Sequence, residues 1–145
     1  MLKYICYFTV FLLFQFTLGC STNNTLTNDQ LYQDIGGQTG IENLVNVFIK
    51  KIAKDKELLP YFAKSSVKHF KKGFISHLCD VVNGPCKYDG DTMRDIHTGM
   101  HISEKDFNRV VELLIESMEE IDLSYRTQNK ILFELAKLRE QVIKI

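Results

Sequence analysis

The sequence lacks several features that would mark a common protein class. It contains no tryptophan, only two prolines and no excess of charge, because eighteen basic residues balance eighteen acidic ones. A chain without a basic excess has no electrostatic footprint for nucleic acid, so no nucleic acid is expected as a partner. With 45% hydrophobic and 25% charged residues, the 145-residue chain is also too apolar to be largely disordered. The composition fits one ordinary globular domain.

Strict alternation of polar and apolar residues, the pattern of half-buried strands, is also missing over any useful length. Apolar residues recur instead at spacings of three and four, which is typical of one face of a helix. Such faces are predicted over 41–52, 67–81, 107–121 and 131–142, with short turns at 29–34 and 57–63 and a brief helical piece at 92–98. The second long helix should stop at Asn83-Gly84-Pro85, because glycine and proline together end a helix efficiently. The pattern predicts an all-α domain over 29–145.

The N-terminal segment differs from this domain. Lys3 is followed by an apolar stretch, residues 5–18, which is shorter than the ~20 residues that a membrane-spanning helix needs. A basic residue before a short apolar stretch and a small residue is typical of a secretory signal peptide, with a buried helix or a membrane anchor as the alternatives. The end of the stretch, Thr17-Leu18-Gly19-Cys20, resembles a bacterial lipoprotein box. The resemblance implies a signal peptide at 1–19, a lipid on Cys20, a polar tether at 20–28 and an exported, membrane-anchored protein.

The cysteine count agrees with export. Cys6 lies in the predicted signal peptide and Cys20 at its end, which leaves Cys79 and Cys86 as an even pair. Outside the cytoplasm this pair could form a disulfide across a short loop, with two free buried thiols as the alternative. No Cys-x-x-Cys-His motif is present, which excludes c-type attachment of a haem.

Among the histidines, His97 and His101 are spaced as two zinc ligands on one helix face would be. Gly99 lies between them, however, and no third ligand with suitable spacing is nearby. A single imidazole at His97, facing the apolar edges of neighbouring helices, would suit axial ligation of a haem iron. Periodicity by itself favours the alternative, a histidine with a purely structural role.

Five short motifs follow one another along the predicted domain. They are Leu31-Tyr32-Gln33-Asp34-Ile35-Gly36-Gly37, Tyr61-Phe62, Asn83-Gly84-Pro85, Tyr88-Asp89-Gly90 and Met93-Arg94-Asp95-Ile96-His97-Thr98-Gly99. As a set they resemble the group I truncated haemoglobins over about residues 29–142. The resemblance implies a two-on-two helical sandwich around haem b, which reversibly binds dioxygen or another diatomic gas such as nitric oxide or carbon monoxide.

The resemblance also assigns residues to the haem. His97 matches the proximal ligand of the iron, and Phe62 matches a phenylalanine that packs on the haem face. Met93 and Phe107 would line the proximal side. The second ring nitrogen of His97 would donate to a carbonyl or another acceptor that fixes the ring.

The distal side departs from the family. Group I members commonly place a tyrosine and a glutamine beside the bound ligand, where this chain has Ile49 and Phe74, and Phe70 is nearest the distal histidine position of other globins. Without a hydrogen-bond donor, dioxygen should leave faster than from a typical member. His77, one turn beyond Phe74, could gate the pocket or act as a sixth iron ligand. The alternative is a half-exposed histidine at the pocket rim.

Two other function classes stay open. A haem-free helical lipoprotein could act as an interaction module, although the presence of His97, Phe62 and Met93 argues against it. A haem enzyme that detoxifies nitric oxide or cleaves peroxide would need polar distal residues for acid–base catalysis, and these are missing. The favoured hypothesis is therefore a lipid-anchored, gas-binding globin, with an unidentified reductase as a further partner.

Overall fold

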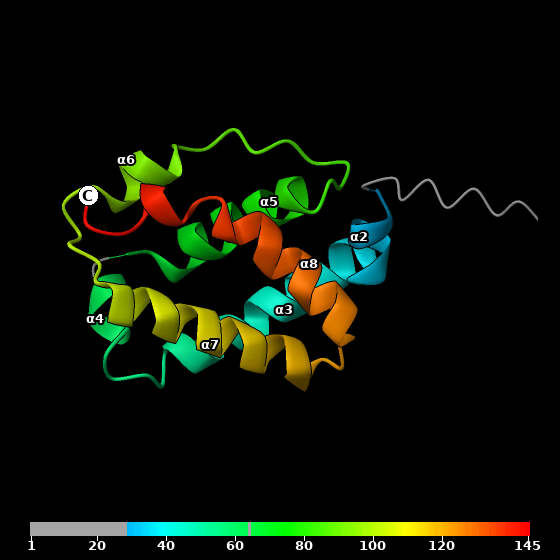
Figure 1. The fold of residues 1–145 in the computed structure, drawn as a ribbon, viewed down its shortest axis with the longest axis horizontal. Helices are drawn as coiled ribbons and strands as arrows, with labels where there is room; N and C mark the ends of the chain where they lie inside the picture. The colour runs from blue at the N-terminus through cyan, green and yellow to red at the C-terminus, as the bar shows by residue number, and fades with distance from the viewer. Residues whose placement is uncertain (1–28, 64) are drawn as a thin grey trace, which may run out of the picture.

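The computed structural model describes residues 29–63 and 65–145, and every regular element in these ranges is helical (Figure 1). The elements are α2 (Asp29–Asp34), α3 (Gly37–Ile52), α4 (Leu59–Phe62), α5 (Val67–Val81), α6 (Met93–His97), α7 (Glu104–Glu120), α8 (Tyr125–Ala136) and the 3-10 turn η1 (Arg139–Gln141). The predicted all-α fold is confirmed. The predicted signal peptide, Cys20 and the tether lie outside the described residues. Within the described ranges, no helix combines the length and the apolar character needed to cross a membrane.

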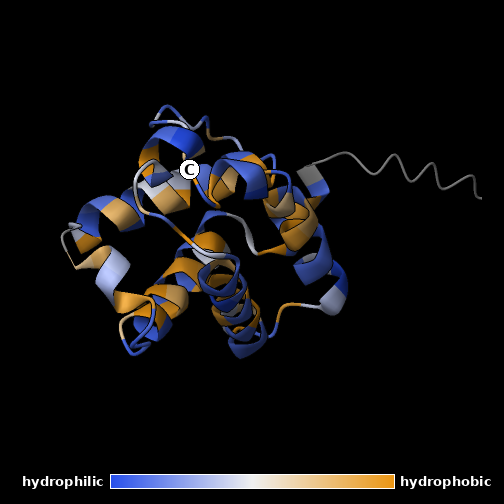
Figure 2. Ribbon diagram, turned by 60° about the vertical axis from the view of Figure 1, so that its left-hand side comes forward, coloured by the Kyte–Doolittle hydropathy of each residue, from blue (hydrophilic) through white to orange (hydrophobic). Residues whose placement is uncertain are grey.

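α3 is the central helix of the fold. It packs against α5 on one side and α7 on another, while α5 also contacts α8 and α2 lies against α3 and α8. The apolar faces, orange in Figure 2, turn toward the interior between these helices. Ile41, Leu44 and Val45 of α3 are fully buried there. α6 lies outside this packed centre, with η1 as its main neighbour.

A sharp turn between α2 and α3 depends on glycine. Gly36 and Gly37 have φ values of 91° and 61°, in the left-handed region that side chains rarely adopt. A Cβ atom on Gly40 would also collide with the carbonyl oxygen of Ile35. The paired glycines therefore let α2 fold back directly onto α3.

One predicted helix end is confirmed and another is wrong. α5 ends at Val81, as predicted from Asn83-Gly84-Pro85. The left-handed residue there is Asn83, with φ 56°, and a Cβ atom on Gly84 would lie 2.6 Å from the Cys79 sulfur. The last helix runs over Tyr125–Ala136 and not to Val142. The apolar spacing continues past Ala136, but there the chain leaves the α-helix, forms the 3-10 turn η1 and continues without a further helix to residue 145.

Candidate functional site

His97 is the last residue of α6, a helix of only five residues. Thr92 caps the helix by accepting a hydrogen bond from the backbone N–H of Asp95. The Nδ1 atom of His97 lies 2.6 Å from the carbonyl oxygen of Met93, where its N–H can donate. This bond fixes the ring and leaves Nε2 as the ring nitrogen with a free lone pair, the form in which imidazole binds a metal.

The structure separates His97 from His101. The helix ends at His97, Gly99 has φ 79°, and His101 is exposed with φ 51°. The two imidazoles therefore do not share a helix face, as the zinc alternative would require. No group of three His, Cys, Asp or Glu side chains arranged to hold a metal ion occurs within the described ranges.

Aromatic side chains from α4 and α5 form a continuous row. The ring centroids of Phe62 and Phe70 are 4.9 Å apart in an edge-to-face arrangement, and those of Phe70 and Phe74 are 5.7 Å apart and stacked. Phe74 reaches on to Phe48 of α3, 5.5 Å away, and Ile49 packs against the same buried cluster. Phe70, Phe74 and Ile49, which are predicted to line the ligand pocket, thus lie in one apolar region with Phe62.

His77 lies on α5, on the face that also carries Phe70 and Phe74. Its ring meets the Tyr88 ring edge to face, with centroids 5.0 Å apart. Its Nε2 atom is buried and has no hydrogen-bond partner, the single case of this kind among the side chains that the structure describes. Burial lowers the pKa of His77, and the charge of His97 acts in the same direction while Asp80 opposes it. A buried imidazole nitrogen ordinarily has a hydrogen-bond or metal partner, and no group among the described residues supplies one to His77.

A disulfide joins Cys79 of α5 to Cys86 in the following loop, with the two Cα atoms 5.8 Å apart. Cys79 is fully buried, two residues after His77. Tyr88 follows Cys86 by two residues and donates its hydroxyl hydrogen to the carbonyl oxygen of Asp91. The disulfide therefore connects the two segments whose side chains, His77 and Tyr88, meet at the site.

The two remaining predicted proximal residues lie on different elements. Met93 opens α6 and supplies the carbonyl that holds the His97 ring. Phe107 lies in the first turn of α7, and its ring is covered by the guanidinium of Arg139, 5.7 Å from the centroid.

Sequence reasoning missed the side chain that positions Phe62. Its neighbour Tyr61 donates a hydrogen bond of 2.9 Å to Oδ2 of Asp106, which also accepts from Ser103 in the capping box of α7. Hydrogen bonds from Ser103 and Tyr61 lower the pKa of Asp106. No local pattern could reveal this contact, because the two residues are 45 positions apart in the sequence.

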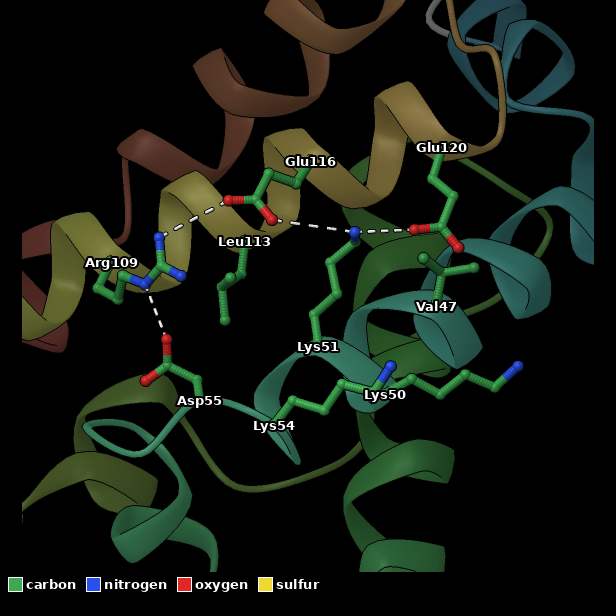
Figure 3. Close-up of a pocket in the computed structure, with 9 residues that line it drawn as sticks. All are labelled: Val47, Lys50, Lys51, Lys54, Asp55, Arg109, Leu113, Glu116 and Glu120. Carbon is green, nitrogen blue, oxygen red and sulfur yellow. Dashed lines mark hydrogen bonds and ion pairs between the residues drawn. The ribbon is translucent and has the colours of Figure 1, made fainter.

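A pocket of about 330 Å³ lies between α3 and α7, where none of the predicted site residues is found (Figure 3). Lys51 pairs with Glu120 at 2.8 Å, and Arg109 pairs with Asp55 at the same distance. The hydrogen bond from Arg109 lowers the pKa of Asp55. These two ion pairs stabilise the packing of α7 against α3 and the turn that follows it. The pocket therefore contributes to the fold and not to the chemistry of His97. Its lining residues are Val47, Lys50, Lys51, Lys54, Asp55, Arg109, Leu113, Glu116 and Glu120.

The chain matches known proteins along most of the described domain. The family model described as bacterial-like globin matches residues 30–144. A group 1 truncated hemoglobin of Tetrahymena thermophila is 28% identical over 114 residues, which are 79% of this chain and 91% of that protein. The group 1 truncated hemoglobin GlbN of Nostoc sp. (strain MUN 8820) is 33% identical over 88 residues, covering 61% of this chain and 75% of the relative.

Solved structures agree with the fold. The truncated hemoglobin of Tetrahymena pyriformis in the Fe(III) form superposes with a TM-score of 0.77 at 23% identity, over 79% of this chain and 98% of that one. The 2/2 hemoglobin of Synechococcus sp. PCC 7002, a cyanomet form with covalently attached heme, gives a TM-score of 0.74 at 18% identity, with the same coverage. The two-on-two arrangement of helices is therefore shared with both.

Proposed function

The chain belongs to the bacterial-like globin family, and we propose that it binds a haem b through His97 and reversibly binds dioxygen or another diatomic gas. The cofactor of this family is haem with its iron, which supplies the coordination position that a gas occupies. Phe62, Phe70 and Phe74 would cover the distal face of the haem, and Met93 and Phe107 would border the proximal side. The protein's part is to hold the iron, shape the space beside it and exclude water.

The observation that carries this proposal is the pair of ring nitrogens left without partners. His97 has its Nδ1 engaged by the Met93 carbonyl, so its Nε2 is oriented as an axial ligand would be. His77 has a buried Nε2 that no described group satisfies. An aromatic row of Phe62, Phe70 and Phe74 accompanies them. Apolar walls with a few oriented nitrogens suit a flat, largely apolar metal cofactor.

His77 would supply a second imidazole ligand to the iron when no gas is bound. Its Nε2 is buried rather than exposed at a rim, and its ring is supported by Tyr88. Ile49, Phe70 and Phe74 offer no donor or acceptor of their own, so His77 is the polar group of the distal side. A gas would then compete with this imidazole for the iron.

Replacing His97 with Ala tests the proposed function. In the full-length chain the variant should lose stable haem binding, followed as the absorption change during titration with haem, and added imidazole should restore part of it. His101→Ala is the matched control, because His101 is exposed and outside the site. Haem binding by His97→Ala that equals wild type would refute the axial assignment.

Replacing His77 with Phe tests the distal assignment separately. The wild-type ferric protein without added ligand should show a six-coordinate, low-spin absorption spectrum, and the variant should not. Identical spectra would refute ligation by His77 while leaving His97 untouched.

Export and lipid attachment are proposed from Lys3, the apolar stretch 5–18 and Thr17-Leu18-Gly19-Cys20. Cys20→Ser should block incorporation of a radiolabelled fatty acid and leave the precursor unprocessed or the protein unanchored. The other cysteines serve as the control, since Cys86→Ser should leave labelling unchanged. Labelling that persists in Cys20→Ser would show that the lipoprotein motif is misinterpreted.

A further inference from the structure

The C-terminal segment 139–145, red in Figure 1, lies beside α6, the helix that carries His97. Two backbone hydrogen bonds join the segment to the residues that follow His97. The N–H of Gly99 donates to the carbonyl oxygen of Ile145, and the N–H of Lys144 donates to the carbonyl oxygen of Ile102, both at 3.1 Å. We call residues 139–145 the C-terminal clasp, because these two bonds attach it to residues 99–102.

Side chains anchor the clasp to the start of α7. Lys144 pairs with Glu104 at 3.1 Å, and Arg139 reaches the same carboxylate at 3.7 Å. The hydrogen bond from Lys144 lowers the pKa of Glu104. The Arg139 guanidinium also covers the Phe107 ring, and Ile143 is only 8% exposed. The clasp therefore links the end of α6 to a long, well-packed helix.

α6 needs such a link because it cannot hold its own position. A helix of five residues forms barely more than one turn, and helices this short are unstable in isolation. No residue of α6 is buried, and Ile96 is 44% exposed, so apolar packing contributes little to its placement. The bond between His97 and the Met93 carbonyl orients the ring relative to α6, but both partners move together with the helix.

We propose that the C-terminal clasp is a positioning element for His97, which sets the place of the proximal imidazole and thereby how firmly the haem is retained. The clasp itself would not touch the iron. This inference rests on the proposed function, since it takes His97 as the ligand.

Two variants of the full-length chain test the clasp. Deletion of Ile145 removes the acceptor of the Gly99 hydrogen bond, and Ile143→Ala weakens the buried anchor. Each should speed haem transfer to an excess of an apo-globin acceptor by about tenfold, the effect of one lost hydrogen bond or comparable packing, and should shift the iron–imidazole stretching band in the resonance Raman spectrum. Lys105→Ala is the matched control, because it removes an α7 ion pair with Glu57 outside the clasp and should change neither.

The inference is overturned if both variants keep wild-type helical content, haem transfer rate and stretching band. If Ile143→Ala fails to fold, the deletion of Ile145 decides alone, since it removes one partly exposed residue. Failure of the proposed function would look different. In that case His97→Ala would retain haem as wild type does, whatever the clasp variants show.

Discussion

α6, which carries His97, is five residues long and is held by the Thr92 cap before it and by the hydrogen bond from Gly99 to Ile145 after it. α5, which carries His77 on a packed face, is fifteen residues long. α5 lies against α3 and α8 along its length and is tied by a disulfide to the next loop. The proximal side thus depends on a few individual polar contacts, while the distal side depends on the sum of many apolar ones. Single substitutions should therefore act on haem retention at α6, and on gas kinetics or stability at α5.

Ile49 and Phe74 can be replaced by the hydrogen-bond donors that these two distal positions lack. Ile49→Tyr combined with Phe74→Gln should slow dioxygen release by ten- to a hundredfold, about 1.4–3 kcal/mol for a charge-assisted hydrogen bond. Carbon monoxide release should change far less, because its bound oxygen atom carries little charge. Stopped-flow measurements on both proteins decide this. An already slow wild-type release would mean that another donor is present, with His77 the first to examine.

Breaking the disulfide tests how far the distal side depends on covalent support. Cys86→Ser should lower the free energy of unfolding by about 2 kcal/mol, because the short loop no longer restricts the unfolded chain. Urea denaturation of oxidised wild type, reduced wild type and the variant measures the effect. The reduced protein should match the variant. Two titratable thiols at Cys79 and Cys86 in the untreated, denatured protein would contradict the bond.

The hydrogen bond from Tyr61 to Asp106 links the segment of Phe62 to α7. Tyr61→Phe should lower the free energy of unfolding by about 1 kcal/mol, measured by urea denaturation near neutral pH. This is a modest value because the hydrogen bond to the charged group is partly exposed. Phe62→Tyr is not a suitable control, since it alters the aromatic row, so Lys105→Ala serves instead as a nearby surface change on α7. No loss of stability in Tyr61→Phe would show that the bond contributes nothing.

The same bond predicts a dependence on pH. Hydrogen bonds hold the pKa of Asp106 below its ordinary value of 3.8 in the folded protein. A group with a depressed folded pKa contributes stability above the unfolded pKa, and this contribution is lost as pH falls through the folded pKa. Tyr61→Phe should therefore unfold at a higher pH than wild type during acid titration, followed by circular dichroism. Acid unfolding of Tyr61→Phe and wild type at the same pH would contradict this expectation.

Local signals explain how much of the fold could be predicted. The range 67–81 matches α5, because Ser66 caps it and apolar residues recur along one face. The predicted range of the last helix, 131–142, begins too late, because the first turn of α8 buries Thr127 and Gln128, which are polar and do not fit an apolar pattern. These two side chains are accommodated by bonds to Ser124 and to the Leu123 carbonyl. Such compensation depends on three-dimensional contacts that periodicity does not encode.

Site residues follow the same division. His97 and Phe62 lie within short motifs, and Phe70 and Phe74 recur at helical spacing, so these candidates follow from signals that are local in sequence. The burial of the His77 nitrogen depends on Tyr88, which reaches it from the loop after α5. The C-terminal clasp depends on bonds between residues more than forty positions apart, such as Gly99 and Ile145. Long-range contacts of this kind leave no spacing pattern in the chain.

The central claim is that His97 is the proximal ligand of a haem iron, and replacing its imidazole by a free one tests this most directly. His97→Gly should bind haem stably only when imidazole is added, and the resonance Raman spectrum of the ferrous protein should then show an iron–imidazole stretching band. Deuterated imidazole should shift that band in the variant and leave the wild-type band in place. A band that is present without imidazole in His97→Gly combined with His77→Phe, or that fails to shift with the labelled compound, would contradict the account.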